Sequence, residues 1–363
     1  MTAARRHFTV DGQFSMHLGG RLESPTIAYE TWGELDQNRS NAILIFTGLS
    51  PSAHAASSKN DPTPGWWEEI IGPGKPIDTR RFFVICVNSL GSCFGSTGPA
   101  SIDPKTGELY RLSFPVLSLE DVARAGYETL KYLGIERLHA IVGPSMGGMT
   151  TLAFEMQFPG LADAMVLMST GTRSLPFSIA LRSLQREMIR KDPAWRGGEY
   201  PIDAPPLTGM RLARKLGMIT YRSAEEWRLR FGRERVGAEH VEGDPFGMNF
   251  EVESYLEHHA KKFVGQFDAN CYLYLSRASD LFDIADHGAS VAGALGRVQV
   301  KRALVIGVKT DFLFPIQQQQ ELADGLSGHG RSVEYHEFES LQGHDAFLVD
   351  MDRYRPTIAK FLA

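Results

Sequence analysis

Residues 140 to 150 read Ala-Ile-Val-Gly-Pro-Ser-Met-Gly-Gly-Met-Thr. An apolar, β-branched approach runs into Gly143-Pro-Ser-Met-Gly147, and an apolar helical pattern follows from Met149 to Phe154. This is the form of a nucleophile elbow, a sharp strand-to-helix turn whose glycines flank an exposed serine because side chains at their positions would collide with the neighbouring strand and helix. The bare pentapeptide also occurs in ordinary loops, so the prediction depends on its flanks. The stretch predicts Ser145 as a nucleophile above a helix N-terminus.

Apolar runs that suit buried strands recur on both sides of this turn, and helical patterns alternate with them. One such helix begins with a capping box, Ser118 with Asp121, and ends at Gly134. Residues 19–32 alternate as strands and are expected to form an antiparallel hairpin at one sheet edge. The fold class is therefore predicted to be α/β, with a mostly parallel, doubly wound sheet. The predicted buried strands lie at residues 41–46, 82–87, 140–142, 164–169, 302–307 and 332–338.

The alternation stops between residues 175 and 295, where helical periodicity continues without a convincing strand. This segment is too long for a loop and too well patterned for disorder. We expect a helical lid insertion at 175–295 over the carboxyl edge of the sheet, with residues 1–174 and 296–363 forming the core.

Charge and composition exclude several classes of partner. The chain has 363 residues, 38 Lys and Arg against 43 Asp and Glu, and a net charge of −5, so no basic excess is available for nucleic acid. The N-terminal residues carry no apolar signal region, and no run of 18 apolar residues occurs. Three scattered cysteines do not make a disulfide framework or a zinc cluster. We expect a cytoplasmic protein without a membrane, nucleic-acid or metal partner.

A nucleophilic serine needs a base, and the base needs an orienting carboxylate. On doubly wound hydrolase-like folds these follow in the order Ser, Asp or Glu, His. Asp311 lies just after a buried strand and His344 in a Gly-His loop after the last strand. Alone, the histidine suits a surface or capping role and the aspartate a turn or helix cap; together with Ser145 they predict a triad. The oxyanion donors are expected at the amide of Met146 and near Phe46, at the end of the first buried strand.

Several motifs extend this prediction over nearly the whole chain. They are Gly65-Trp-Trp, Ile71-Gly-Pro-Gly-Lys, Ile77-Asp-Thr, Gly95-Ser-Thr-Gly-Pro-Ala-Ser, Ser145-Met-Gly-Gly-Met, Asp311-Phe-Leu-Phe-Pro and Gly343-His-Asp-Ala-Phe-Leu. Together they resemble the homoserine O-acetyltransferase family of α/β-hydrolase-fold acyltransferases. Two further stretches resemble its serine O-succinyltransferase branch most: Thr47-Gly-Leu-Ser-Pro-Ser-Ala-His-Ala-Ala and Pro176-Phe-Ser-Ile-Ala-Leu-Arg-Ser-Leu-Gln-Arg-Glu.

The resemblance implies an α/β-hydrolase fold, the triad Ser145, Asp311 and His344, and a homodimer joined through the helical insertion. It also implies that Arg214 and Asp345 hold an amino-acid acceptor. A guanidinium suits an α-carboxylate, and a carboxylate suits an α-ammonium group. A solvated helix face for Arg214 and a loop cap for Asp345 are the alternatives.

Two departures from the acetyltransferase pattern bear on specificity. The loop of Leu49, Ser50, Pro51 and Ser52 is longer than the family's usual one, which would narrow the acceptor pocket from homoserine towards serine. Arg182 stands where the acetyl enzymes carry a neutral Asn, and it would offset the cost of burying the terminal carboxylate of a succinyl group. A structural role for Arg182 is the alternative.

The resulting hypothesis is a ping-pong transferase that moves a succinyl group from succinyl-CoA through Ser145 to L-serine, supplying cysteine synthesis. Acyl-CoA is a cosubstrate, and no metal or tightly held cofactor is expected. Three alternatives stay open: a homoserine O-acetyltransferase or O-succinyltransferase in methionine synthesis, a plain serine esterase, and a non-catalytic binding protein on the same fold.

Overall fold

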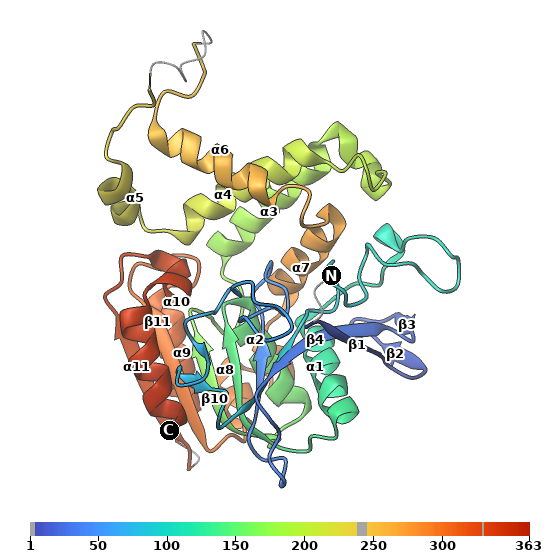
Figure 1. The fold of residues 1–363 in the computed structure, drawn as a ribbon, viewed down its shortest axis with the longest axis vertical. Coiled ribbons are helices and arrows are strands. Elements are labelled where there is room, and N and C mark those ends of the chain that lie inside the picture. Colours follow the sequence, from blue (N-terminus) through green and yellow to red (C-terminus); the bar gives the residue numbers. More distant parts are fainter. Residues whose placement is uncertain (1–3, 238–244, 329) are drawn as a thin grey trace.

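A single eight-stranded sheet forms the centre of the computed structural model, which describes residues 4–237, 245–328 and 330–363 (Figure 1). The strands are β1 Arg6–Thr9, β2 Gln13–Ser15, β3 Arg21–Glu23, β4 Thr26–Trp32, β5 Ala42–Phe46, β6 Ile71–Gly72, β7 Ile77–Asp78, β8 Phe83–Val87, β9 Leu138–Pro144, β10 Ala162–Met168, β11 Arg302–Val308 and β12 Ser332–Phe338. The order across the sheet is β1-β4-β8-β5-β9-β10-β11-β12. All pairs from β8 to β12 are parallel, which confirms the predicted doubly wound sheet.

The antiparallel edge is built differently from the expected hairpin. β4 pairs antiparallel with β1 and β8, whereas β3 pairs with β2 in a separate small sheet. The chain turns sharply between β3 and β4, where Ser24 has a φ of 45° and is followed by Pro25, which has no N–H to donate. The bend therefore sends the two halves of residues 19–32 to different partners.

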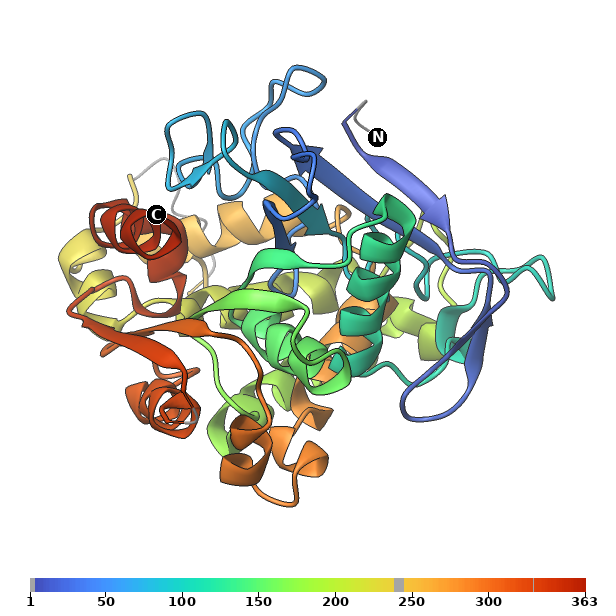
Figure 2. The same cartoon turned by 90° about the horizontal axis from the view of Figure 1, so that it is seen from below.

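Both faces of the sheet are buried because neighbouring residues of each strand point to opposite sides. Along β5, Leu44 and Phe46 belong to one apolar cluster, and Ile43 and Ile45 to the other. Helices α1, α2 and α9 cover the first face, and α11 covers the second, as the view from below shows (Figure 2). The helices are α1 Leu119–Leu133, α2 Met146–Gln157, α3 Pro176–Lys191, α4 Leu207–Tyr221, α5 Ala224–Phe231, α6 Glu251–Phe263, α7 Ala269–Leu281, α8 Val291–Gly296, α9 Ile316–Leu326, α10 Ala346–Val349 and α11 Met351–Leu362.

The predicted start and stop signals of α1 are confirmed. The Ser118 hydroxyl accepts a hydrogen bond from the Asp121 amide, the Asp121 side chain accepts one from the Ser118 amide, and Gly134 closes the helix in the left-handed conformation. No helix within the described ranges is both long and apolar enough to cross a membrane.

Helices fill the chain between β10 and β11. α3 to α6 lie as a layer above the core, and α7 leads back down towards it (Figure 1). α8 packs against α9 beside the sheet. The division of the chain at residues 174/175 and 295/296 into folding units stays a prediction.

Candidate active site

The turn at Ser145 has the geometry that residues 140–150 predict. Ser145 follows β9 directly, is the N-cap residue of α2, and has φ 55° and ψ −125°, a conformation that few non-glycine residues adopt. A Cβ on Gly143 would lie 2.1 Å from the Gly147 carbonyl oxygen, and a Cβ on Gly147 would lie 2.3 Å from the Phe46 carbonyl oxygen. Both positions therefore require glycine, and the tight turn presents the serine hydroxyl at the end of β9.

Ser145, His344 and Asp311 form one hydrogen-bonded chain. The His344 Nε2 atom lies 2.8 Å from Ser145 Oγ, and its Nδ1 atom lies 2.8 Å from Asp311 Oδ2. The other Asp311 oxygen accepts hydrogen bonds from the amides of Leu313 and Phe314 at 2.9 and 3.0 Å, so the carboxylate both holds its turn and faces the imidazole. A proton on Nδ1 leaves Nε2 free to accept the serine proton, which is the arrangement of a general base.

Electrostatics favour the protonated form of this histidine. Burial alone would lower the pKa of His344, but the charge and hydrogen bond of Asp311 and the charge of Asp345 outweigh burial and the opposing charge of Arg182. The pKa of His344 is therefore raised above 6.5. Once the imidazole takes up a proton, its surroundings stabilise the charge that forms.

The expected oxyanion donors are the amide of Met146 and an amide near Phe46. Met146 is the first residue of α2, where a backbone N–H has no partner inside the helix. Phe46 is the last residue of β5 and is buried. The loop after β5 reaches the nucleophile through Leu49, which lines the same cavity as Ser145 and Met146.

A small cavity of about 50 Å³ opens over the nucleophile. Its lining includes Ser145 and His344 from the core, Arg182 and Tyr221 from α3 and α4 of the helical layer, and Tyr272 from α7. The layer therefore closes the site from above, where it would keep water from a reactive intermediate.

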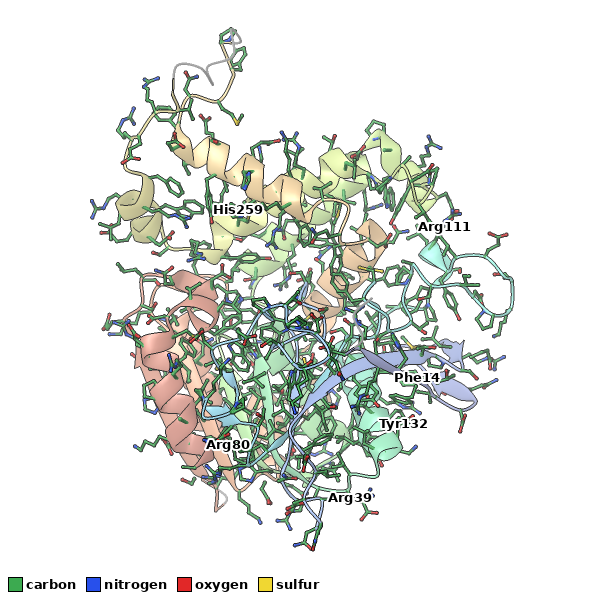
Figure 3. The ribbon with its side chains drawn as sticks, viewed as in Figure 1. Phe14, Arg39, Arg80, Arg111, Tyr132 and His259 are labelled. Carbon is green, nitrogen blue, oxygen red and sulfur yellow. The ribbon has the colours of Figure 1, made fainter. Side chains whose placement is uncertain are left out.

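A second cavity, of about 470 Å³, adjoins the first at Tyr221 and contains both predicted acceptor-binding residues. The Arg214 guanidinium lies 4.4 Å from the ring centre of Phe263, so this arginine does not lie on a solvated helix face. Asp345 makes no capping hydrogen bond and pairs instead with Arg222 Nε at 3.2 Å. Burial raises the pKa of Asp345, although the charges of Arg222, His344 and Arg214 oppose the rise. His259 lines this cavity from α6, in the layer above the core (Figure 3).

Comparisons with known proteins show the family of this chain. A family model described as the alpha/beta hydrolase fold matches residues 41–350. A serine O-succinyltransferase of Litchfieldella anticariensis is 57% identical over 364 residues, spanning 100% of this chain and 99% of the relative. The solved homoserine O-acetyltransferase of Bacillus anthracis aligns with a TM-score of 0.91 at 31% identity, covering 99% of this chain and 97% of that one. The chain belongs to the homoserine O-acetyltransferase family. A solved esterase is also similar, with a TM-score of 0.89, 30% identity and 99% coverage of both chains.

In this member of the homoserine O-acetyltransferase family, Arg182 pairs with Asp280, a partner that the sequence did not predict. Arg182 Nε lies 2.6 Å from Asp280 Oδ1, and its Nη2 donates to Ser174 Oγ at 2.5 Å. Asp280 also pairs with Arg186 at 2.7 Å, and its side chain is 1% exposed. Among the hydrogen bonds of the described residues, none uses Arg182 Nη1. Arg182 thus has a structural contact and still lines the cavity over Ser145.

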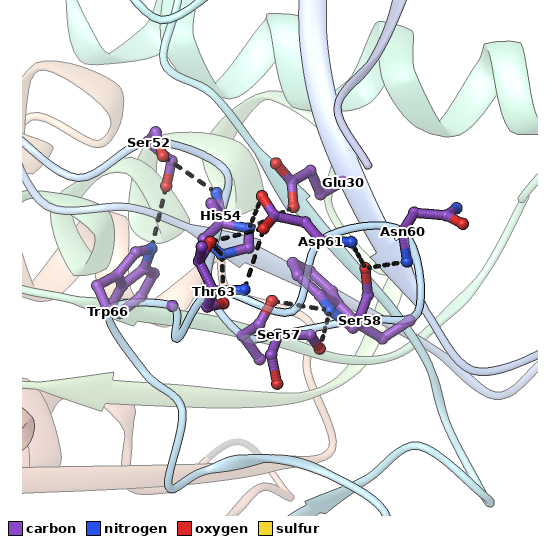
Figure 4. A network of polar contacts seen from close by, with 12 residues as sticks. Glu30, Ser52, His54, Ser57, Ser58, Asn60, Asp61, Thr63 and Trp66 are labelled. Carbon is purple, nitrogen blue, oxygen red and sulfur yellow. Dashed lines mark hydrogen bonds and ion pairs between the residues drawn. The ribbon is translucent and has the colours of Figure 1, made fainter. Parts of the chain in front are cut away.

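A polar network holds the end of the loop of residues 49 to 52 at Ser52 (Figure 4). The Ser52 hydroxyl accepts the His54 amide at 3.2 Å, and the Ser52 carbonyl accepts Trp66 Nε1 at 3.0 Å. His54 is itself held by Glu30 and Thr63, each 2.9 Å from one ring nitrogen. Leu49 reaches the Ser145 cavity from this loop, whereas Ser50, Pro51 and Ser52 are half-buried beside it.

Sequence reasoning missed Tyr221, Tyr272 and Asp280. Tyr221 lines both cavities, Tyr272 lines the cavity over Ser145, and Asp280 pairs with Arg182. Each lies in an ordinary helical pattern, and only the packing of α3, α4 and α7 brings them to the site.

Proposed function

We propose that this chain transfers a succinyl group from succinyl-CoA to the hydroxyl of L-serine. The observation that carries the proposal is the hydrogen-bonded chain from Ser145 through His344 to Asp311, on the floor of a cavity that also contains Arg182. The 57% identity to a serine O-succinyltransferase along the whole chain supports the choice of donor and acceptor.

The proposed reaction has two half-reactions through one base. His344 Nε2 takes the proton of Ser145, whose oxygen attacks the thioester carbonyl; the carbon–sulfur bond breaks, and the CoA thiolate leaves with the proton from His344. The hydroxyl of L-serine then gives its proton to His344 and attacks the acyl carbon. The ester bond to Ser145 Oγ breaks, Ser145 takes the proton back from His344, and O-succinylserine leaves. The amides of Met146 and of the Phe46 end of β5 stabilise the oxyanion in both steps. No metal or tightly held cofactor takes part.

The acceptor is assigned to the second cavity. Arg214 binds the α-carboxylate of serine there, and Asp345 binds its α-ammonium group. The cation of the acceptor stabilises the ionised form of Asp345, which burial disfavours. Leu49, on the loop with Ser50, Pro51 and Ser52, lines the adjoining cavity over Ser145, into which the acceptor hydroxyl must reach. This loop limits the length of the acceptor chain, which favours serine over the longer homoserine.

Steady-state rates with L-serine and L-homoserine, each against succinyl-CoA and acetyl-CoA, test the substrate assignment. We expect serine with succinyl-CoA to give the highest kcat/KM of the four pairs. A preference for homoserine would overturn the acceptor and move the enzyme to methionine synthesis, and a preference for acetyl-CoA would overturn the donor.

Arg182→Asn tests the donor site separately. The substitution removes the guanidinium that would face the terminal carboxylate of the succinyl group, so we expect kcat/KM for succinyl-CoA to fall roughly 10- to 100-fold and that for acetyl-CoA to change little. Equal losses with both donors would show that the contact of Arg182 with Asp280 is its only role.

An esterase is the second candidate, because a solved esterase shares the fold at 30% identity. Release of free succinate from the acyl-enzyme without any acceptor, at a rate equal to transfer, would favour it. The Ser145→Ala variant should lose both activities; full transfer activity in that variant would favour a binding protein without catalysis.

We propose that the enzyme works in the cytoplasm as a homodimer joined through the helical layer. Large apolar side chains on α3 and α4 are exposed in the single chain, as a covered face requires. They are Phe177, Leu184, Leu207, Leu212 and Ile219. Light scattering measures the assembly directly, and a monomer at micromolar concentration would contradict it.

A further inference from the structure

We infer that His17, Glu120 and His287 form a binding site for a zinc-type divalent cation on the core, outside both cavities of the active site. One ligand atom from each residue lies within 4.8 Å of the other two. The residues come from the β2–β3 connection, the first turn of α1, and the short helix Ile284–His287.

The donor atoms have nearly the spacing that a tetrahedral ion requires. His287 Nε2 lies 2.9 Å and His17 Nε2 3.8 Å from the same oxygen, Glu120 Oε1. Bonds of about 2.1 Å at tetrahedral angles separate ligand atoms by about 3.4 Å, a value between these two distances. The two imidazole rings lie 28° from parallel, with their centres 5.9 Å apart. Small shifts of two side chains would complete the geometry.

Glu120 is a buried carboxylate that lies beside two histidines near the surface. Its side chain is 6% exposed, whereas that of His17 is 42% exposed, so an ion can reach the carboxylate past His17. A buried carboxylate is unfavourable unless a positive partner compensates it. Two imidazoles can do so by hydrogen bonding, or they can share an ion with it.

The backbone of each ligand residue is already held in place. Asp121 Oδ1 accepts the His17 amide at 2.7 Å, Gln157 Nε2 donates to the Glu120 carbonyl at 2.9 Å, and Arg297 donates to the His287 carbonyl. These bonds fix the backbone positions from which the three side chains project towards one another.

Two imidazoles and one carboxylate are a donor set that zinc accepts, with water in the fourth position. An ion here would join three segments that are remote in sequence. Phe14 of β2 lies close to α1, the helix on which Tyr132 is labelled (Figure 3). The Arg124 guanidinium of α1 lies 4.7 Å from the centre of the Phe14 ring. The helix of His287 follows α7, at the point where the helical insertion returns to the core. The ion would therefore stabilise that return.

Calorimetric titration of chelator-treated protein with zinc chloride tests the site, with cobalt(II) absorption as a second readout. We expect one ion per chain at micromolar protein concentration, and at least roughly tenfold weaker binding in His287→Ala and Glu120→Gln. The matched control is His336→Ala, which removes another surface histidine facing a carboxylate, Glu334 at 3.7 Å, and should bind zinc as the unaltered protein does.

Absence of zinc binding, or equal binding in His287→Ala, would overturn the site and leave a hydrogen-bonded cluster. A thiolate-to-cobalt absorption band would place the ion on a cysteine and overturn it as well. If Glu120→Gln does not fold, His17→Asn replaces an exposed side chain and keeps the test open. Zinc should raise the Tm of His336→Ala but not that of His17→Asn; an equal rise in both would contradict the assignment.

Discussion

His344 and His54 each lie beside a buried carboxylate, and their other ring nitrogens face different groups. His344 contacts Asp311 through Nδ1 at 2.8 Å, and His54 contacts Glu30 through Nδ1 at 2.9 Å. The difference is at the second ring nitrogen. His344 Nε2 faces the Ser145 hydroxyl, which can donate or accept. His54 Nε2 faces the Thr63 carbonyl at 2.9 Å, which only accepts, and the Thr63 hydroxyl at 3.2 Å, whose proton is donated to Asp61 Oδ1 at 2.6 Å.

The partner at Nε2 decides what each imidazole can do. Both His54 nitrogens face acceptors, so the ring satisfies them only as the doubly protonated cation. Burial alone would lower the pKa of His54, but hydrogen bonds to Glu30 and Thr63 and the charges of Glu30 and Asp61 outweigh it and raise the pKa. His344 can instead alternate between neutral and charged forms. A histidine–carboxylate pair is therefore a base only where its other nitrogen faces a proton that it can take.

The largest expected contrast is between His344→Gln and His54→Gln. Loss of the base should lower kcat about 10⁴-fold or more, because Ser145 then has no proton acceptor. His54→Gln should keep kcat within about tenfold and raise KM for the acceptor, since His54 acts through the loop of Leu49 to Ser52. Steady-state kinetics on variants shown to be folded by circular dichroism measure both. An equal loss of kcat in the two variants would contradict the assignment of His344 as the base and of His54 as a support of the loop.

A smaller effect is expected in the pH profile of the first half-reaction. His344 must be neutral to act, and its pKa is raised above 6.5, so kcat/KM for the acyl donor should increase with pH through that raised pKa. The charge of Asp345 contributes to the rise, so Asp345→Asn should move the acid limb to lower pH. His54→Gln serves as the control and should leave the limb in place. If the acid limb moves in His54→Gln but not in Asp345→Asn, the titrating group is His54 and not His344, and the prediction is wrong.

The smallest effect concerns stability. Glu30→Gln removes the charge that holds the His54 cation, and we expect a loss of about 1 to 3 kcal/mol at pH 6. Because the folded-state pKa of His54 is raised, its contribution is complete below the unfolded value of 6.5 and disappears as pH rises through the folded value. Urea unfolding of both proteins from pH 6 to 9 should show the difference shrinking. A difference that grows with pH would mean that His54 is neutral in the native state.

The comparison also shows where sequence reading succeeds. The Ser145 turn is specified locally, because its two glycines are demanded by contacts within the turn and with the adjoining strand β5. Asp311 and His344 were found because each follows a strand of a recognisable parallel sheet, and parallel strands end at one edge. Residues 19–32 were read incorrectly as one hairpin, since the pairing of β3 and β4 depends on which strands lie nearby.

Side-chain partners across elements had no such signal. Nothing near Arg182 in sequence announces Asp280, which is 98 residues away, and nothing near Glu120 announces His287, which is 167 residues away. The sequence led us to expect no metal, because the ligand residues that we now infer are spread over three remote segments.

By itself, the sequence determined the alternation of buried strands with helices, the strand-to-helix turn at Ser145, and the family, since these depend on periodicity, turn chemistry and motifs that act over a few residues. Only the tertiary structure decided which histidine lies between a carboxylate and a serine hydroxyl and which lies between a carboxylate and a backbone carbonyl. The reason is physical: both have a carboxylate neighbour, and the proton that each ring carries is set by the atom at its other nitrogen, which the fold supplies from elsewhere in the chain.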